Sequence, residues 1–459
     1  KPFHFFHNEE KFLFSSEIKQ ILPFMKGDIK VNRKVLYDFL YLSYHHHATG
    51  TFFSGVESLA AGHNLTLDIN TSSFIIEKFY ELNKLTFDKK HTIDESIEKF
   101  KNKFENSIKL RLRSDVNVGT CLSGGLDSSY VAKIASENYT NKKQFTAITA
   151  KSIDSKNDES LYAKKVVDEF NLAWKITAPD KNDFDIVMDK VVERQEEPFA
   201  SPSIVMQYFV MKKAKEEGCI VMLDGQGGDE TLLGYERYFI PYLNSLKKPY
   251  AFLKEFFNLS KNSKLSISKL LSYYLYFSFK IIKKKRILIK NDFILKENIK
   301  YFNDKLSSVF LSKSNNLFEL QKKEIVEIQL PKLLKYEDRN SMAHSIEARV
   351  PFLDHNLLEY SVSMPPENKI FKGWSKYVLR KSFKENEMND IAWRKNKFGF
   401  EAPSEKWMKN RDEFISFIND STFMKNIIKK DYSYKDIDNN SIWKLYNVAK
   451  WAEIYKVNY

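Results

Sequence analysis

A stretch from Cys121 to Ser129 contains residue types that bind phosphate. It reads Cys-Leu-Ser-Gly-Gly-Leu-Asp-Ser-Ser, and its glycines allow backbone N–H groups to approach an anion closely. The serine hydroxyls and the positive start of a helix add to this attraction. Asp127 would repel a polyphosphate unless a divalent cation lay between them, so we expect Mg²⁺ here. A glycine pair alone is typical of an ordinary helix start, but the complete string is more specific.

A second acidic turn, from Leu223 to Glu230, reads Leu-Asp-Gly-Gln-Gly-Gly-Asp-Glu and again follows an apolar run. Loops that follow parallel strands meet at the same edge of a sheet. We therefore predict that Asp127 and Asp229 together hold the Mg²⁺ and that the ion offsets charge on the phosphates. The alternative is ordinary turn chemistry, because Asp-Gly and Gly-Gly-Asp are common in turns.

The first string resembles SGGxDS, the pyrophosphate loop of the ATP pyrophosphatases, and lacks the lysine of the GxxxxGK[ST] loop. With the motifs below, the chain is similar to glutamine-dependent asparagine synthetases. This resemblance implies ATP and Mg²⁺ as cofactors, attack on the α-phosphorus, and an acyl-adenylate intermediate. The ATP-binding residues that it implies are Leu122, Ser123, Gly124, Gly125, Asp127, Ser128, Ser129, Ile148 beside the adenine, Asp224 and Gly225.

The second turn departs from the family's SGEGxDE motif at two positions. Asp224 stands in place of serine, and Gln226 stands where asparagine synthetases carry a glutamate that is thought to assist amide formation. Glutamine cannot act as a general base, although its carbonyl oxygen can accept a hydrogen bond from an amine. Either another group takes the proton, or the acceptor differs from free aspartate. The resemblance makes Gln226 and Glu230 candidate catalytic residues.

A third segment, Lys335 to Asp354, closely resembles the most recognisable part of the family's synthetase domain. Within it, Glu347 and Arg349 could bind the ammonium and carboxylate of an amino-acid substrate, since arginine suits planar bidentate recognition. The alternative is an internal ion-pair network, which we prefer for Asp338 with Arg339.

A fourth segment, Arg394 to Phe400, resembles the family's RxKxGF loop with one extra residue. Aligning the Gly-Phe ends places Lys397 on the lysine thought to stabilise charge on the adenylating phosphate. Lys397 is therefore the third candidate catalytic residue, and Lys395 is the alternative. Without the resemblance, a lysine on such a loop is usually just solvated.

The elements that must position these residues follow an α/β pattern. Apolar runs and helical patterns alternate from the first loop to the second, which predicts a doubly wound parallel sheet of the ATP pyrophosphatase type. An apolar stripe within residues 83–110 predicts a helix ahead of the first loop. We expect strands at 116–122, 144–150 and 219–223, and helices at 128–138, 159–170 and 203–217.

Residues 1–82 contain short apolar stretches between turns, which predicts a β-rich layer with one helix, Arg33 to Tyr41. This region resembles the closing third of the family's glutaminase domain, an Ntn-hydrolase fold. The family's N-terminal cysteine nucleophile is not in these residues. The first residue is Lys1 and not Met, so we expect the sequence to start inside a longer gene product or after processing. His45 to His47 predicts a polar loop and not a metal site. The predicted domains are then 1–82 and 83–459.

Residues 241–329 are least like the family. Between Lys247 and Lys300 this segment mixes lysine with aromatic and aliphatic residues. It could be a helical insertion over the active site, or a patch that contacts an anionic membrane or partner. We favour the packed insertion, because the aromatic residues recur at helical spacing without a clean polar face.

The composition of the chain argues against some classes of binding partner. The formal net charge of +13 comes mostly from lysine and no arginine-rich arm is present, so we expect no nucleic-acid partner. Cys121 and Cys219 lie in apolar runs, which predicts reduced core residues. The sequence has neither a signal peptide nor an uncharged run of membrane-spanning length, so we expect a cytoplasmic protein without a transmembrane segment. A homodimer is a further expectation.

These motifs together predict an ATP-dependent ligase that adenylates a carboxylate, with aspartate as the expected substrate. Ammonia from glutamine would then give the amide, asparagine, with AMP and pyrophosphate as the other products. One alternative is a related amidotransferase for another acid or amine, as in β-lactam synthetases or the tailoring of surface polysaccharides. The other is a nucleotide-binding scaffold without ligase activity.

Overall fold

The computed structural model describes residues 2–45, 47–82, 85, 91–140, 144–303, 305–306, 309, 316–395 and 399–459. Within these ranges the largest sheet has five parallel strands in the order β10-β9-β6-β7-β8. Their bounds are Val118–Cys121 (β6), Thr146–Ala150 (β7), Ala173–Thr177 (β8), Val221–Leu223 (β9) and Glu347–Arg349 (β10).

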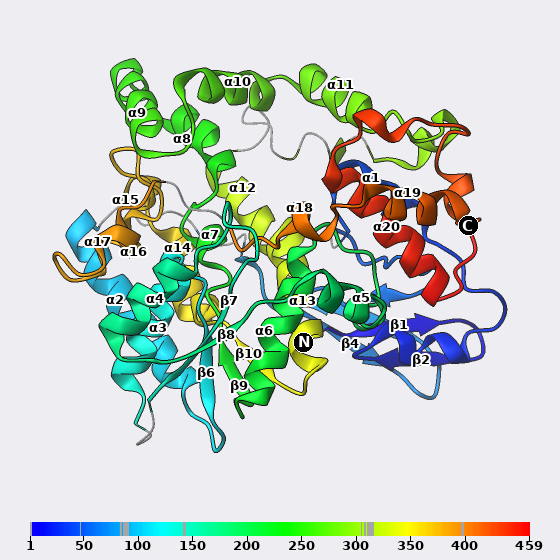
Figure 1. Cartoon of the computed structure of the whole chain (residues 1–459), viewed down its shortest axis with the longest axis horizontal. Helices are drawn as coiled ribbons and strands as arrows, with labels where there is room; N and C mark the ends of the chain where they lie inside the picture. Colours follow the sequence, from blue (N-terminus) through cyan, green and yellow to red (C-terminus); the bar gives the residue numbers. More distant parts are fainter. Residues whose placement is uncertain are drawn as a thin grey trace.

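Helices cover both faces of this sheet (Figure 1). One face packs on α2, α3 and α4, and the other packs on α6. The predicted doubly wound parallel sheet is therefore confirmed. These helices span Ile93–Arg111 (α2), Leu126–Asn138 (α3), Ser160–Phe170 (α4), Lys181–Gln195 (α5) and Ser203–Glu216 (α6).

The order of the strands reverses beside β6. The chain passes from β6 to β7 and β8, and then returns to place β9 on the other side of β6. Thr120 of β6 lies opposite Leu223 of β9, so the two strands end side by side. The loops that follow them flank this switch point, which is where α/β sheets bind their ligands.

Most predicted elements are present, with shorter strands than expected. The strands β6, β7 and β9 each lack the outer residues of their predicted ranges, and α3 begins two residues earlier than predicted. The strands β8 and β10 were not predicted. Cys121 and Cys219 are both free cysteines in the sheet region, as predicted.

The N-terminal region is β-rich with one α-helix in its described part. His4–His7 (β1), Phe12–Ser15 (β2) and Glu57–Ser58 (β3) form an antiparallel sheet, and His63–Leu67 (β4) pairs with Phe74–Lys78 (β5). The helix α1 covers Arg33–Leu42. The prediction of a polar loop is wrong for His45, which is buried against Tyr336; His47 pairs with Asp38, and His46 lies outside the described residues.

The N-terminal region shares a hydrophobic core with the C-terminal helix α20, Asn439–Ile454. Phe52 and Phe53 pack edge-on against Trp451, whose indole N–H donates to the carbonyl of Glu196 (2.9 Å). The remaining helices are α12 (Leu317–Lys323), α13 (Leu330–Met342), α14 (His355–Ser363), α15 (Pro366–Lys369), α16 (Tyr377–Arg380), α17 (Asn389–Ala392), α18 (Ser404–Trp407) and α19 (Arg411–Asp420).

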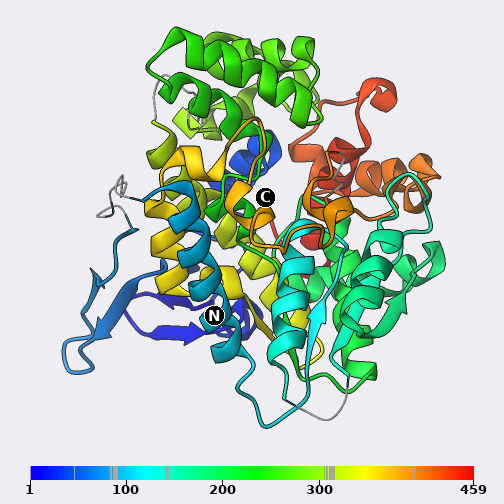
Figure 2. The ribbon, with the colours of Figure 1, turned by 90° about the vertical axis from the view of Figure 1, so that its left-hand side faces the viewer.

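Residues 239–290 are helical, as the sequence predicts. They form the helices Phe239–Ser245 (α8), Pro249–Asn262 (α9), Ile267–Ser278 (α10) and Lys280–Lys290 (α11). The last three run along the upper side of the molecule in Figure 1, and Figure 2 shows them at the same side. Among the described residues, none of the helices has the length and apolar character needed to cross a bilayer.

Candidate active site

The first loop places its serine hydroxyls around the start of α3. The N–H of Ser123 donates to Oγ of Ser128 (3.2 Å), and the two hydroxyls lie 3.0 Å apart. Gly125, the residue before α3, provides no side-chain cap for the helix N–H groups. Gly124 has φ +75°, and a Cβ there would lie 2.6 Å from the backbone nitrogen of Ala163, so only glycine fits against α4.

The two predicted metal-binding carboxylates converge on one cation. Nζ of Lys376 lies 2.6 Å from Oδ2 of Asp127 and 2.5 Å from Oδ1 of Asp229. The side chain of Lys376 is buried, and its backbone has φ +53°, which is uncommon for a residue with a side chain. The structure thus brings Asp127 and Asp229 together, as predicted, and adds a lysine between them.

The role of Lys376 is not visible in the sequence. This lysine lies about 250 residues after Asp127, at the start of α16, in a segment without a recognised motif. Gly234 is the indirect signal, because a Cβ there would collide with both Asp229 and Lys376. That requirement is visible only in three dimensions.

The second loop interlocks with the first through its glycines. A Cβ on Gly225 would lie 3.0 Å from the backbone nitrogen of Ser128, and one on Gly228 would lie 2.7 Å from Oδ1 of Asp127. Gly227 has φ +91° and leads into the short helix α7, Gly228–Thr231. Backbone packing therefore fixes the separation of the two acidic turns.

Asp224 is the first of the two positions where the second turn departs from the family motif. Burial raises the pKa of its carboxyl group to about 6. The thiol of Cys121 and the N–H groups of Gly225 and Gln226 bind the carboxylate and oppose this shift, while the charge of Asp127 adds to it. Gln226 is partly exposed on the same turn.

Glu230 is buried at the end of this turn. The hydroxyl of Tyr235 donates to its Oε1 (2.6 Å). Burial, followed by the charge of Asp229, raises the pKa of Glu230 to about 7, and the hydrogen bond from Tyr235 partly offsets the shift. A carboxyl group with a pKa near neutral pH can accept or return a proton during a reaction.

A cleft of about 430 Å³ opens beside Asp229 and Tyr235. Its lining includes aromatic side chains of the 239–290 helices and several basic groups. Arg394 is held there by Glu159 (2.6 Å) and lies over the ring of Tyr162. The cleft is lined by Asp229, Tyr235, Arg237, Phe239, Ser263, Lys264, Tyr273, Phe277, Ser375, Arg380, Arg394 and Lys395, among others.

Of the two lysines aligned with the family's loop, Lys395 lies at the rim of this cleft. Lys397 lies outside the described residues. Its catalytic role stays a prediction.

The positions of Glu347 and Arg349 do not match the substrate-binding role that is expected of them. Glu347 begins β10, opposite Val221 at the start of β9, and so lies at the edge of the sheet away from both loops. Arg349 donates to Glu347 (2.9 Å) and to the carbonyl oxygens of Arg111 (2.7 Å) and Arg113 (2.8 Å). These contacts favour the alternative, a structural ion pair, here partly exposed, that also binds the end of α2.

Leu122 and Ile148 are joined by a backbone hydrogen bond within the sheet region. The N–H of Leu122 donates to the carbonyl of Ile148 (2.8 Å). The side chain of Ile148 is buried in the apolar cluster between the sheet and α6, and Leu122 packs on the opposite face. Nothing in this packing exposes Ile148 to a ligand, so contact with adenine stays a prediction.

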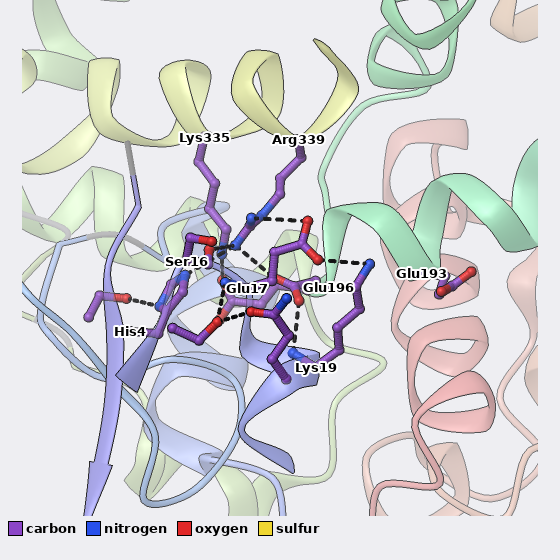
Figure 3. A network of polar contacts seen from close by, with 12 residues as sticks. His4, Ser16, Glu17, Lys19, Glu193, Glu196, Lys335 and Arg339 are labelled. Atoms are coloured by element: carbon purple, nitrogen blue, oxygen red, sulfur yellow. Dashed lines mark hydrogen bonds and ion pairs between the residues drawn. The ribbon is translucent and has the colours of Figure 1, made fainter. Parts of the chain in front are cut away.

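A buried ion network joins the N-terminal region to the sheet domain (Figure 3). Arg339 of α13 binds the carboxylate of Glu196 (2.6 Å) and donates to the carbonyl of Ser16 (2.8 Å). Lys335, one turn earlier, pairs with Glu197. Arg339 is part of a buried ion-pair network, with Glu196 as a partner. The predicted participation of Asp338 stays a prediction.

Both acidic members of this network also bind the N-terminal region. Glu196 accepts the N–H of Lys19 (2.8 Å), and Glu197 accepts the N–H of Phe52 (2.7 Å). Burial, and then the charges of Lys335 and Arg339, hold the pKa of His4 well below its usual range. These contacts therefore connect the region that resembles a glutaminase domain to α13 and to the end of α5.

Comparison with known proteins agrees with this arrangement. A family model described as asparagine synthase matches residues 99–442, which is most of the chain. The chain belongs to the asparagine synthase family. The suspected resemblance is thus confirmed, and a second model, described as a glutamine amidotransferase domain, matches residues 1–80.

Several curated members of the family are similar to this chain. Asparagine synthetase [glutamine-hydrolyzing] 1 of Bacillus subtilis is 24% identical over 98% of this chain and 72% of that protein. Asparagine synthetase 2 of the same organism is 26% identical, and a putative asparagine synthetase 2 of Methanocaldococcus jannaschii is 31% identical. The chain spans only about half the length of these last two relatives, 50% and 49%.

Among solved structures, an NH3-dependent NAD synthetase from Campylobacter jejuni is 17% identical and matches 51% of this chain and 96% of that chain. Its TM-score is 0.24, so it adds nothing to the assignment made from the strand order and the family model.

Proposed function

We propose that this chain carries the synthetase part of a glutamine-dependent amide ligase. An oxygen of the substrate carboxylate attacks the α-phosphorus of ATP and pyrophosphate leaves; ammonia then attacks the acyl carbon and AMP leaves. The observation that carries this proposal is the convergence of Asp127, Asp229 and Lys376 beside the uncapped start of α3. Charges of both signs are gathered there at the switch point of the sheet, where phosphates bind.

The phosphates of ATP would lie against the first loop, bound by its N–H groups and by the hydroxyls of Ser123, Ser128 and Ser129. Lys376, which lies between Asp127 and Asp229, would add its positive charge beside them. Asp127 and Asp229 fit Mg²⁺, because two carboxylates plus phosphate oxygens are a usual magnesium environment, and both already share a cation. When bound, the ion supplies positive charge to the leaving pyrophosphate.

The acceptor acid would occupy the cleft beside Asp229. Gln226 cannot take a proton from the attacking amine. Glu230 has the suitable pKa, and its hydrogen-bond partner Tyr235 lines the cleft. We therefore assign proton acceptance to Glu230, with Tyr235 between it and the substrate. Aspartate is the proposed acid, since the related enzymes are named asparagine synthetases.

Glutamine is the proposed source of the ammonia. The match of residues 1–80 to a glutamine amidotransferase domain supports this source. The network of Arg339, Lys335, Glu196 and Glu197 would hold that region in register with the synthetase site.

A second candidate is the same chemistry on an acid larger than aspartate. Two observations favour it: Gln226 replaces the family's glutamate, and Tyr273 and Phe277 of α10 line the cleft. Aromatic side chains bind sugar rings and other extended groups better than they bind a small dicarboxylate.

Pyrophosphate release tests both candidates. The chain is incubated with Mg·ATP, ammonium chloride and either aspartate or a series of uronic and amino acids. Release with aspartate supports an asparagine synthetase, whereas release only with another acid supports the second candidate. Release with no acid contradicts both and favours a nucleotide-binding scaffold. Asp127→Asn should abolish release while leaving the circular dichroism spectrum unchanged, and full activity of that variant would refute its role.

A further inference from the structure

Positive charge in this protein is concentrated in one segment. Residues 247–290 contain twelve lysine and arginine residues and one acidic residue, Glu255. This gives a net charge of +11, against +13 for the whole chain. The net charge of the rest of the protein is therefore close to zero, and any long-range attraction of anions is directed to this segment.

The same segment exposes apolar side chains at helical spacing. Each of the helices α9, α10 and α11 carries them on its outer face, where residues three, four, seven or eight apart lie together. Ile281 is 82% exposed and Tyr250 is 72% exposed. Representative pairs are Tyr250 and Phe257 on α9, Leu271 and Leu275 on α10, and Ile281 and Ile289 on α11.

The three helices form one layer with distinct inner and outer faces (Figures 1 and 2). Leu259, Leu270 and Ile287 are buried and form the inner face. Glu255 is also turned inward, where it accepts the backbone N–H of Gly373 (3.1 Å). The outer face therefore presents exposed lysines, such as Lys254, Lys269 and Lys285, between apolar side chains.

We infer that this outer face of α9–α11 binds the surface of an anionic lipid bilayer. Helices with exposed apolar residues among lysines insert shallowly at the headgroup boundary, and anionic headgroups attract their charge. A second copy of the chain would bring a face of the same charge. A nucleic acid would match the charge but would leave the aliphatic side chains in water.

Vesicle flotation tests this inference with the full chain and without ATP, so its result is independent of the ligase activity. We expect the protein to float with phosphatidylcholine vesicles that contain about 30% phosphatidylglycerol, and not with phosphatidylcholine alone. Binding should fall when salt is raised from about 0.1 M to about 1 M.

Two triple variants separate the contributions of charge and apolar contact. Lys254→Glu, Lys269→Glu and Lys285→Glu together should weaken binding at least about 100-fold, because each basic residue near such a surface contributes about fivefold. Phe257→Ser, Leu271→Ser and Ile281→Ser together should weaken it with the charge retained. All six positions are exposed, so thermal unfolding should stay unchanged.

Matched controls come from exposed positions elsewhere. Lys151→Glu, Lys215→Glu and Lys409→Glu change the net charge equally, and Ile69→Ser, Leu161→Ser and Ile186→Ser remove apolar groups that are similarly or more exposed. Both controls should bind like the wild type. The inference is overturned by absence of flotation at low salt, by equal binding to neutral vesicles, by controls that weaken binding as much as the α9–α11 variants, or by a protein that binds RNA but no vesicle.

Discussion

The two halves of the candidate site are built in different ways. On the phosphate side, backbone fixes the geometry: Gly225 and Gly228 pack directly against the loop that carries Asp127. On the acceptor side, the wall is made of side chains from the 239–290 helices, such as Tyr273 and Phe277. Backbone contacts constrain a site tightly, whereas a side-chain wall can change without disturbing the fold. The first half can thus stay constant while the second adapts to a new acid.

The electrostatics of the two halves differ as well. Asp127 and Asp229 are already paired with the ammonium of Lys376. Asp224 and Glu230 instead have raised pKa values, about 6 and about 7, because they are buried with less compensation. The phosphate side is therefore prepared to hold charge, and the acceptor side is prepared to exchange protons.

The largest expected effect comes from removing the shared cation of the phosphate side. Lys376→Met should lower pyrophosphate release about 1,000-fold, because one preorganised charge on a developing anion contributes roughly that factor. It also leaves two carboxylates facing each other, so the melting temperature should fall. Release is measured with saturating acceptor acid and ammonium chloride.

Lys381→Met is the matched control for this variant. Lys381 follows α16 and is exposed, with its ammonium over the ring of Trp393 (5.8 Å). It should release pyrophosphate at the wild-type rate. Equal rates for both variants would show that Lys376 plays no part in the phosphate chemistry.

A smaller effect is expected on the acceptor side, and on one step alone. Glu230→Gln should lower amide formation about 100-fold, the usual contribution of a general base, while pyrophosphate release survives. In the wild type, amide formation should rise with pH through about 7 as the carboxyl group of Glu230 ionises. The variant should lack this rise.

Tyr235→Phe gives the assignment of Glu230 a sharper test. The hydroxyl of Tyr235 holds the pKa of Glu230 down, so its removal should move the rise in amide formation to higher pH. A pH profile that is unchanged in Tyr235→Phe, or a Glu230→Gln variant that loses both steps equally, would contradict proton acceptance by Glu230.

The sequence alone was sufficient for the two loops of the phosphate side, because the geometry of each loop is local. Glycines, serines and an aspartate within nine residues predict the first loop. Two loops that follow parallel strands must then meet at the same edge of the sheet. The pairing of Asp127 with Asp229 followed from topology alone. Lys376 could not be predicted, since it reaches the two carboxylates from a segment about 250 residues after Asp127 and no local pattern marks it.

The acceptor side was harder to predict, because its side chains come from distant segments. Glu347 and Arg349 matched a motif, yet the short strand β10 turns them to each other and to the end of α2. The burial of His45 likewise depends on Tyr336, almost 300 residues later. Neither contact leaves a periodic or local signal in the sequence.

The smallest expected effect is on the stability of the fold. It comes from Asp224, which lies at the border between the phosphate side and the acceptor side. Burial raises the pKa of Asp224 from 3.8 to about 6, so the fold favours its protonated form. The stability that comes from the protonated form of Asp224 is fully present below about pH 4, and it is lost as the pH rises through 6. Asp224→Asn stays neutral, and at pH 7.5 it should increase the free energy of unfolding by up to about 3 kcal/mol, the free-energy equivalent of the rise in this pKa from 3.8 to about 6. Thermal unfolding should show a higher melting temperature for the variant at pH 7.5 and equal values near pH 4.

Asp115→Asn, at an exposed position ahead of β6, is the control and should not change the melting temperature at either pH. A destabilised Asp224→Asn at pH 7.5 would mean that the ionised carboxylate is held by the Cys121 thiol and the N–H groups of the turn more strongly than burial penalises it. Asp224 would then belong with the charge-holding phosphate side, and the border between the two halves would move to Gln226.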